Sequence, residues 1–293
     1  MKRCDPLRVR QSPRSRKPSC SAGLTASAKD ARERAPRQRP YNNLLLYIID
    51  YLFLKHWRLI PLLEASGEIQ MAVDKWLLEQ HRQGKQPSTL RFYTWKPAAI
   101  SLGYHQQCPQ NWQQLSVDIV RRPTGGKAVL HQGDLTYAIV TSAMSKRGEV
   151  YKYLCQFLID GWRSLGVNLD YGDARAEYAD HHNCFATATS ADLITEDGKK
   201  AIGSAQLRRR KAILQHGSMS LKDNSDLFIK IFNEPAPQNL LPIVPSLENR
   251  NISTIVEALK LAAEDWFKIN LVLQPLSQAE WQDILNKSVS ARY

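Results

Sequence analysis

At the centre of the sequence stands Arg121-Arg122-Pro123-Thr124-Gly125-Gly126-Lys127-Ala128-Val129-Leu130-His131. Val117, Ile119 and Val120 lead into it, and a mostly apolar run continues to residue 140, so the pattern predicts a strand, a glycine turn and a second strand. Two adjacent glycines let the backbone reach positive φ and approach a bulky neighbour closely. The two arginines offer donors for an anion or a carboxylate. On its own, the stretch fits a plain basic β-hairpin as well as a ligand-binding turn.

Net charge is concentrated at one end of the chain. The 293 residues allow one large domain or two small ones and carry a net charge of +12. Residues 1–40 hold 12 Lys and Arg against 3 Asp and Glu, whereas the other 253 residues hold 28 against 25. Because the excess lies in the tail and not in the expected folded part, we expect no nucleic-acid partner.

The N-terminal segment is unlike the rest of the chain. Residues 1–40 are rich in Arg, Ser, Pro and Ala, which predicts disorder. They also match an organelle transit peptide, or a start placed too far upstream. The apolar run at 44–54 is too short to span a bilayer, so no membrane association is expected. We therefore divide the chain into a basic leader with a short apolar segment, 1–56, and a catalytic domain, 57–293.

Cysteine usage indicates a reducing compartment. The five cysteines, at 4, 20, 108, 155 and 184, are odd in number and form no CxxC pair. We expect a cytoplasmic protein, or one of the stroma or matrix if the leader is a transit peptide. His181, His182 and Cys184 lack partners at metal-ligand spacing, so no metal site is predicted.

Hydrophobic periodicity predicts helices alternating with strands. A helix is expected at 69–83, with Met71, Trp76 and Leu77 inward and Asp74, Glu79 and Gln80 outward. Further helices are expected at 147–165, at 253–270 and from Ser277, where Ser277 and Glu280 form a capping box. Strands are expected at 57–60 (an edge strand), 90–95, 98–102 and 212–221. Asp-Gly at 197–198 predicts a hairpin, and the basic run 208–211 reads as a solvated hairpin end.

One thiol and one ammonium form a possible nucleophile pair. Lys200 opens the second strand of the 192–203 hairpin, and Cys184 lies in the polar loop before it. A nearby ammonium favours the thiolate, which is the nucleophilic form, and can pass a proton to a leaving thiol. Spacing alone also fits an ordinary loop thiol, or a thiol served by His182 as its base.

Five segments in order resemble the biotin/lipoate protein ligase superfamily, of lipoate–protein ligase A type. They are Met71-Ala-Val-Asp74, Ser101-Leu-Gly-Tyr104, Arg121–His131 with Asp134-Leu-Thr-Tyr137, Lys200-Ala-Ile-Gly-Ser-Ala-Gln206 and Leu214-Gln-His-Gly-Ser218. The resemblance covers about residues 57–293. It implies an α/β fold like that of class II aminoacyl-tRNA synthetases and biotin ligases, with helices packed on a mixed, mostly antiparallel sheet.

Within that superfamily, Asn183-Cys184-Phe185 is similar to the nucleophile region of the cysteine-type octanoyltransferases. This branch takes octanoyl from acyl carrier protein and transfers it, through a cysteine thioester, to a lysine of a lipoyl domain or the glycine-cleavage H protein. No cofactor is then implied. The alternatives are an ATP- and Mg-dependent lipoate ligase acting through lipoyl-AMP, and a non-catalytic carrier-protein-binding module.

The resemblance also implies roles for individual residues. Cys184 would be the nucleophile and Lys200 its catalytic partner. The acyl pocket would lie between the turn at 124–126 and the strand at 200–206. Its substrate-binding residues would be Arg121, Arg122, Thr124, Gly125, Gly126, His131, Gly203, Ser204, Ala205, Gln206, His216 and Gly217.

Overall fold

The computed structural model describes residues 55–143, 147–172, 192–221, 225–234, 236, 240 and 252–290. The expected leader, up to residue 54, lies outside these ranges. So do Cys184, His181 and His182, and most of the proline-containing loop after residue 234. The predictions made for these segments therefore stay predictions.

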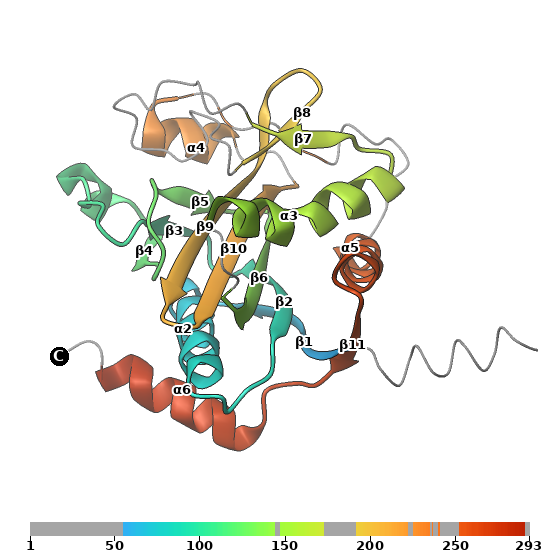
Figure 1. The fold of residues 1–293 in the computed structure, drawn as a ribbon. Helices are drawn as coiled ribbons and strands as arrows, with labels where there is room; N and C mark the ends of the chain where they lie inside the picture. Colours follow the sequence, from blue (N-terminus) through green and yellow to red (C-terminus); the bar gives the residue numbers. More distant parts are fainter. Residues whose placement is uncertain are drawn as a thin grey trace, which may run out of the picture. The chain divides into compact units, whose positions relative to one another are not determined.

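Within the described ranges, eight strands form one mixed sheet in the order β11-β1-β2-β6-β10-β9-β8-β7 (Figure 1). β1 is parallel to both of its neighbours, and every other pair is antiparallel. This confirms the expected α/β fold with a mostly antiparallel sheet. The strands are β1 (Lys55–Ala65), β2 (Thr89–Trp95), β6 (Asp134–Ser142), β7 (Leu169–Tyr171), β8 (Leu193–Thr195), β9 (Lys200–Arg209), β10 (Ala212–Ser220) and β11 (Ile269–Leu273).

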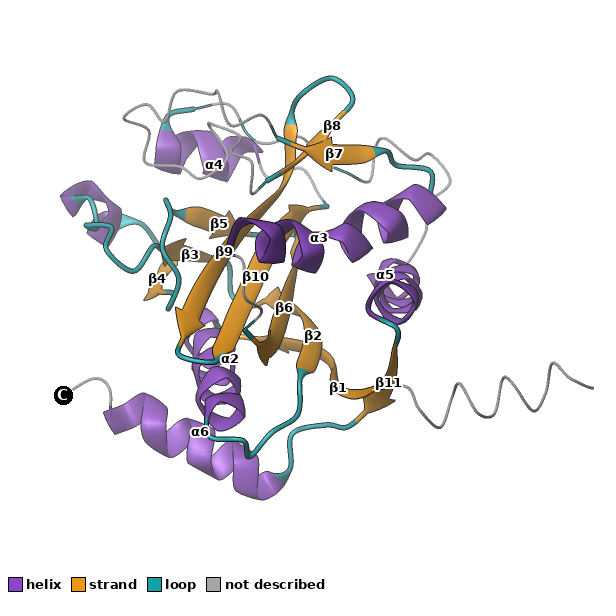
Figure 2. Ribbon diagram, in the orientation of Figure 1, coloured by secondary structure: helices purple, strands orange, loops and turns teal. Residues whose placement is uncertain are grey.

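Helices cover both faces of this sheet (Figure 2). α3 (Arg147–Ser164) and α5 (Ile252–Phe267) pack on one face, and α2 (Gly67–Arg82) and α6 (Gln278–Ser290) on the other. Strand alternation divides the core between the two faces: Leu90 and Phe92 of β2 point to one cluster, and Tyr93 and Trp95 to the other. Among the described residues, no helix combines the length and apolarity needed to cross a bilayer.

The central stretch is not a hairpin, contrary to the prediction. A second sheet has the order β4-β3-β5, with β3 (Ala99–Leu102) lying between β4 (Asp118–Arg121) and β5 (Val129–His131). β3 is parallel to β4 and antiparallel to β5. The glycine turn therefore crosses over the end of β3. The 3₁₀ helix η1 (Gln110–Gln114) and α4 (Ser225–Phe232) pack on this sheet through Trp112, Phe228 and Phe232.

Two polar residues of α2 are buried where the sequence predicted exposure. Ser66 caps the helix, as Ile69 N–H donates to its Oγ at 3.5 Å. Asp74 is fully buried and Gln80 is nearly so, whereas both were expected to face outward. Asp74 is buried because its carboxylate contacts Arg91, Tyr93 and His216 of the sheet.

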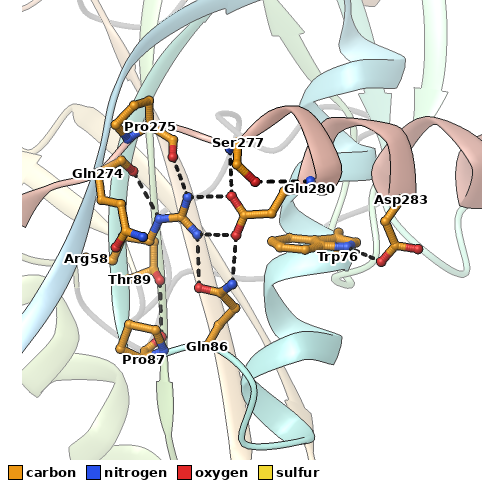
Figure 3. Close-up of polar contacts among 10 residues, drawn as sticks. All are labelled: Arg58, Trp76, Gln86, Pro87, Thr89, Gln274, Pro275, Ser277, Glu280 and Asp283. Carbon is orange, nitrogen blue, oxygen red and sulfur yellow. Dashed lines mark hydrogen bonds and ion pairs between the residues drawn. The ribbon is translucent and has the colours of Figure 1, made fainter.

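A buried arginine fastens the C-terminal helix to the first strand (Figure 3). Arg58 of β1 makes a two-pronged ion pair with Glu280 of α6, at 2.7 and 2.8 Å. Its remaining N–H groups donate to Gln86 Oε1 and to the carbonyls of Gln274 and Pro275. The predicted capping box of α6 is confirmed, because Ser277 N–H donates to Glu280 and Glu280 N–H to Ser277. β1 is not the expected edge strand, because β11 covers it.

Candidate active site

A cavity lies between the glycine turn of the small sheet and the β9–β10 strands of the large one. Residues from both sheets and from α2 line it: Met71, Tyr93, Trp95, Ser101, Arg122, Gly126, Lys127, Val129, His131, Thr136, Asp192, Lys200, Gly203, Ser204, Ala205, His216, Gly217 and Ser218. Most of them are apolar, small or hydroxyl-bearing. Such a cavity suits an elongated, mainly apolar group with a polar end.

The backbone of the glycine turn passes very close to the backbone at the end of β3. A Cβ on Gly103 would lie 1.8 Å from the carbonyl oxygen of Gly126, so no other residue fits there. Gly126 itself has a φ of +93°, in the region that favours glycine. Tyr104 N–H donates to the Thr124 carbonyl at 2.9 Å. The turn therefore requires its glycines, as the sequence predicted. They are needed because the chain crosses the end of β3 at close range, and not because it forms a hairpin.

Both arginines of the central stretch bind backbone carbonyls. Arg122 is buried and donates to the carbonyls of Ser101, Gly125 and Lys127 at 2.6–2.8 Å. Arg121 donates to the carbonyls of three residues between 103 and 106 at 2.6–3.1 Å, and it does not line the cavity. Both side chains thus brace the crossover. Their predicted role as donors to a substrate anion stays a prediction.

A buried relay connects α2, β10 and the glycine turn. His216 lies with Nδ1 2.7 Å from Asp74 Oδ2 and with Nε2 2.7 Å from Thr124 Oγ1. If the carboxylate accepts from Nδ1–H, Nε2 is left to accept from the Thr124 hydroxyl. Asp74 and Thr124 are fully buried, while His216 lines the cavity. These hydrogen bonds therefore fix the position of the glycine turn through His216, whose side chain lines the cavity.

Arg91 of β2 completes this buried cluster without full hydrogen bonding. Its Nη1 lies 3.3 Å from Asp74 Oδ1, and its guanidinium stacks over the Tyr93 ring at 4.0 Å. Nη2 donates to Gln70, but Nε, Nη1 and Asp74 Oδ1 have no hydrogen-bond partner. Burial, and then the charge of Asp74, raises the pKa of Tyr93 well above its usual value. Tyr93 thus stays protonated and donates to Asp74 at 3.0 Å.

A second histidine lines the cavity on the side of β5. His131 has Nδ1 2.7 Å from Asp134 Oδ2 and Nε2 2.9 Å from Ser101 Oγ. The indole of Trp95 stacks on its ring at 3.7 Å between centroids. Asp134 Oδ2 also accepts from Ser218 at 2.7 Å. These contacts leave His131 little freedom, so it forms a rigid, polar part of the wall.

Lys200 also lines the cavity, at the start of β9 as predicted. Its Nζ is 2.9 Å from Asp192 Oδ2, and each side chain is 3% exposed. Asp192 was not singled out in the sequence, although it stands directly before β8. Cys184 lies outside the described residues, so its contact with Lys200 stays a prediction.

The buried Cys155 of α3 is not a second nucleophile. Its Sγ lies 3.1 Å from Gln215 Nε2 and 3.7 Å from the Tyr137 hydroxyl. Burial raises the pKa of this thiol to about 11, so it is protonated near neutral pH. This agrees with the inert core role that its apolar helical surroundings predict.

Eight of the twelve residues predicted to bind substrate line the cavity, namely Arg122, Gly126, His131, Gly203, Ser204, Ala205, His216 and Gly217. The other four do not: Arg121, Thr124, Gly125 and Gln206. Thr124 acts through His216, Gly125 accepts from Arg122, and Gln206 donates to Gln215 at 2.9 Å. Asp74 and Arg91 had not been predicted as site residues; Asp74 was named only as an outward-facing helix residue and as the last residue of a family motif.

Comparisons with known proteins agree on one family. A model of the lipoyl protein ligase A/B catalytic domain matches residues 66–269. A protein named octanoyltransferase LipM from Brevibacillus brevis is 34% identical over 217 residues, 68% of this chain and 78% of its own length. The protein of that name from Bacillus subtilis is 32% identical over 253 residues, 76% of this chain and 91% of its own length.

Solved structures share the architecture. A Thermoplasma acidophilum protein described as a lipoate protein ligase, solved with bound lipoic acid, has a TM-score of 0.68 and 21% identity, covering 80% of this chain and 95% of its own. A lipoate-protein ligase A solved with ATP has a TM-score of 0.67 and 20% identity, covering 80% and 94%. At this identity the likeness shows the fold alone.

Proposed function

The chain belongs to the lipoyl protein ligase A/B catalytic family, and from this premise we propose that it transfers an octanoyl group to a specific lysine of a lipoyl domain or a glycine-cleavage H protein. This acyl transfer is a step of lipoate cofactor biosynthesis. The relatives named octanoyltransferase support this reaction, at 29–38% identity. The donor in the proposal is octanoyl thioester-linked to acyl carrier protein.

The reaction proceeds in two balanced steps. The Cys184 thiolate attacks the thioester carbonyl, a new thioester forms on Cys184, and the carrier thiolate leaves with a proton from Lys200. The acceptor lysine amine then attacks this thioester, the amide forms, and Cys184 leaves as the thiolate while the amine proton returns to Lys200. Such a double displacement gives ping-pong kinetics.

The buried Lys200–Asp192 pair is the observation that carries the proposal. The Asp192 carboxylate lies 2.9 Å from Nζ and holds in place the side chain that would donate a proton to the leaving thiolate. Both groups line the cavity, so the proton donor faces the bound acyl group. Since the pair is excluded from water, its charges act more strongly than at the surface.

The cavity walls supply the rest of the site. Gly203, Ala205 and Val129 present small or apolar surface for the acyl chain. Gly217 has no room for a side chain, since a Cβ there would lie 2.5 Å from Ser204 Oγ and 2.6 Å from the Gly203 carbonyl. A backbone N–H of the glycine turn at 124–126 would stabilise the oxyanion of the tetrahedral intermediate.

ATP-dependent ligation is the main alternative. The solved lipoate ligases share this fold at 20–21% identity, whereas the relatives at 29–38% identity carry the octanoyltransferase name. We therefore propose a reaction without ATP or Mg. A carrier-binding module without catalysis is the second alternative, and it predicts no acyl transfer.

Intact-mass measurement after mixing with octanoyl carrier protein tests the proposal. We expect one octanoyl adduct without ATP, lost in Cys184→Ser and retained in the matched control Cys108→Ser. Adding a lipoyl domain then moves the adduct to the acceptor. Acceptor modification that needs ATP and survives Cys184→Ser would establish the ligase instead.

A further inference from the structure

A strongly basic groove lies beside the cavity. It is formed by the end of α2, the β4 end with the glycine turn, and the β9–β10 hairpin. Figure 1 shows α2, β4 and the β9–β10 turn gathered at one end of the sheets. Seven cationic side chains line it against one carboxylate, Glu79: Lys75, Arg82, Arg121, Arg122 and the arginines at 208, 209 and 210.

The lining of this basic groove carries more positive than negative charge. Arg82 donates to Glu79 at 2.5 and 2.8 Å, and these hydrogen bonds lower the pKa of Glu79 to about 2. Within the lining, Glu79 therefore pairs with Arg82. Arg121 and Arg122 bind backbone carbonyls, which fix their positions without cancelling their charge. Burial lowers the pKa of Lys75 against the opposing effect of Asp74 and Glu68, whereas Arg209 and Arg210 are exposed.

This concentration is not a property of the whole surface. Residues 41–293 carry 28 Lys and Arg against 25 Asp and Glu, which is close to balance. Seven cations beside one carboxylate in a single groove is therefore a local asymmetry. A groove of one charge sign attracts partners of the opposite sign and speeds their association.

The groove and the cavity share one lining residue. Arg122 lines both, and β9 runs from Lys200 in the cavity to Leu207 in the groove. Seven residues of strand at about 3.3 Å each place these two positions roughly 23 Å apart. A molecule held in the groove therefore reaches Lys200 only if it carries a long extension.

We infer that the basic groove docks an acidic carrier protein, which reaches the cavity with an acyl thioester on an extended arm. The inference rests on the proposed acyl transfer and assigns the surface that the donor uses. Tyr104, 48% exposed, and Pro123 add apolar contact among the arginines. Tyrosine and arginine are the residue types that dominate protein-protein binding energies.

Distance favours the donor over the acceptor. The acceptor presents its lysine on a four-carbon stem, which is far shorter than the separation of groove and Lys200. An acceptor must therefore contact the cavity mouth near Lys200 directly. The arm of a carrier protein is the component suited to bridging the two sites.

Charge reversal at the hairpin tip tests the inference. In Arg209→Glu/Arg210→Glu the turn residue at φ 54° keeps an unbranched side chain, so the backbone is not further strained. The control is Lys96→Glu/Lys268→Glu, which changes the same net charge at lysine side chains that are 75% and 74% exposed and outside the groove. Transfer is measured from octanoyl carrier protein and from octanoyl-pantetheine, a small neutral donor.

We expect the tip variant to raise the KM for the carrier protein at least tenfold at low salt, with kcat unchanged. The effect shrinks toward 1 M salt, where charges are screened within about 3 Å. The small donor and the control variant should match wild type. An equal rise for both donors, the same rise in the control, or a rise only in the KM for the acceptor overturns the inference.

Wild-type transfer from octanoyl-pantetheine tests the proposed function separately. If wild type transfers nothing from either donor, the proposed function fails, and fluorescence anisotropy with labelled carrier protein still decides the docking surface. Salt-sensitive binding that the tip variant weakens at least tenfold supports the groove as the docking site. Equal binding by wild type and tip variant rejects it.

Discussion

Two arginines on neighbouring strands are both buried, yet their surroundings differ. Arg58 of β1 uses all five of its N–H groups in hydrogen bonds, two of them to Glu280 (Figure 3). Arg91 of β2 has Nε and Nη1 without hydrogen-bond partners and faces Asp74 at 3.3 Å. The first arginine joins two ends of the fold, and the second adjoins the relay under the cavity. The contacts of Arg58 therefore stabilise the fold, whereas the N–H groups of Arg91 that lack partners lower stability beside the candidate site.

The largest effect is expected from Arg58→Met. It removes the cation that pairs with the Glu280 carboxylate and leaves two backbone carbonyls without their Arg58 donor, so the free energy of unfolding should fall by about 3–5 kcal/mol. Urea denaturation measures this loss. Lys96→Met removes an exposed pair and should change stability by less than about 0.5 kcal/mol. Octanoyl transfer at low temperature should stay near wild type in both variants. Equal stability of the two variants would show that the Arg58–Glu280 contact does not stabilise the fold.

Arg91→Met should lower transfer activity more, and stability less, than Arg58→Met. Because Arg91 makes a single hydrogen bond and a 3.3 Å ion pair, we expect a smaller loss of about 1–3 kcal/mol. Transfer should fall about tenfold or more, since Asp74 loses the cation that balances its charge beside His216. Parallel denaturation and kinetic measurements test this. If Arg91→Met destabilises more than Arg58→Met and leaves kcat/KM intact, the contrast is wrong.

Two substitutions of His216 test its two hydrogen bonds separately. Asn keeps a donor near the Nδ1 position facing Asp74, and Gln keeps a polar atom near the Nε2 position facing Thr124. If holding the glycine turn is what matters, His216→Asn should lower kcat/KM about tenfold, close to 1.4 kcal/mol, and His216→Gln less. Both should melt within a few degrees of wild type. The reverse ranking would place the function at Asp74.

The smallest expected effect is the pH dependence of the Arg58 contact. Hydrogen bonds from Arg58 lower the pKa of Glu280 from 4.5 to about 2. The stabilisation is thus complete above about pH 4.5 and is lost as the pH falls toward 2. The stability difference between wild type and Glu280→Gln, followed by denaturation at stepped pH, should shrink through this window. A constant difference would exclude this linkage.

Local patterns in the sequence predicted the elements that depend on neighbouring residues. The Asp-Gly turn gives the β8–β9 hairpin, with Gly198 at a φ of 78°. The Ser277–Glu280 capping box starts α6, and the apolar stripe gives α3. Each depends on residues a few positions apart, where spacing alone carries the information.

The features that were missed depend on partners far along the chain. β3 lies between β4 and β5, which nothing in the central stretch indicates. Asp74 looked solvent-facing because its partner His216 is 142 residues away. β11 was taken as the end of a helix, although Lys268, at a φ of 52°, breaks the helix there. Asp192 gains its meaning only from its ion pair with Lys200.

The pairing of β1 has a consequence for synthesis of the chain. Its outer neighbour β11 and its ionic partner Glu280 are made more than 200 residues after Arg58, which is 222 positions from Glu280. A chain emerging from the ribosome therefore carries β1 with its outer edge unpaired and its buried cation unmatched until residues 269–280 have been made. Contacts of such long range close slowly, and an open strand edge invites intermolecular pairing. Formation of β11 thus protects this strand edge from aggregation, and α6 then supplies the partner of the buried cation.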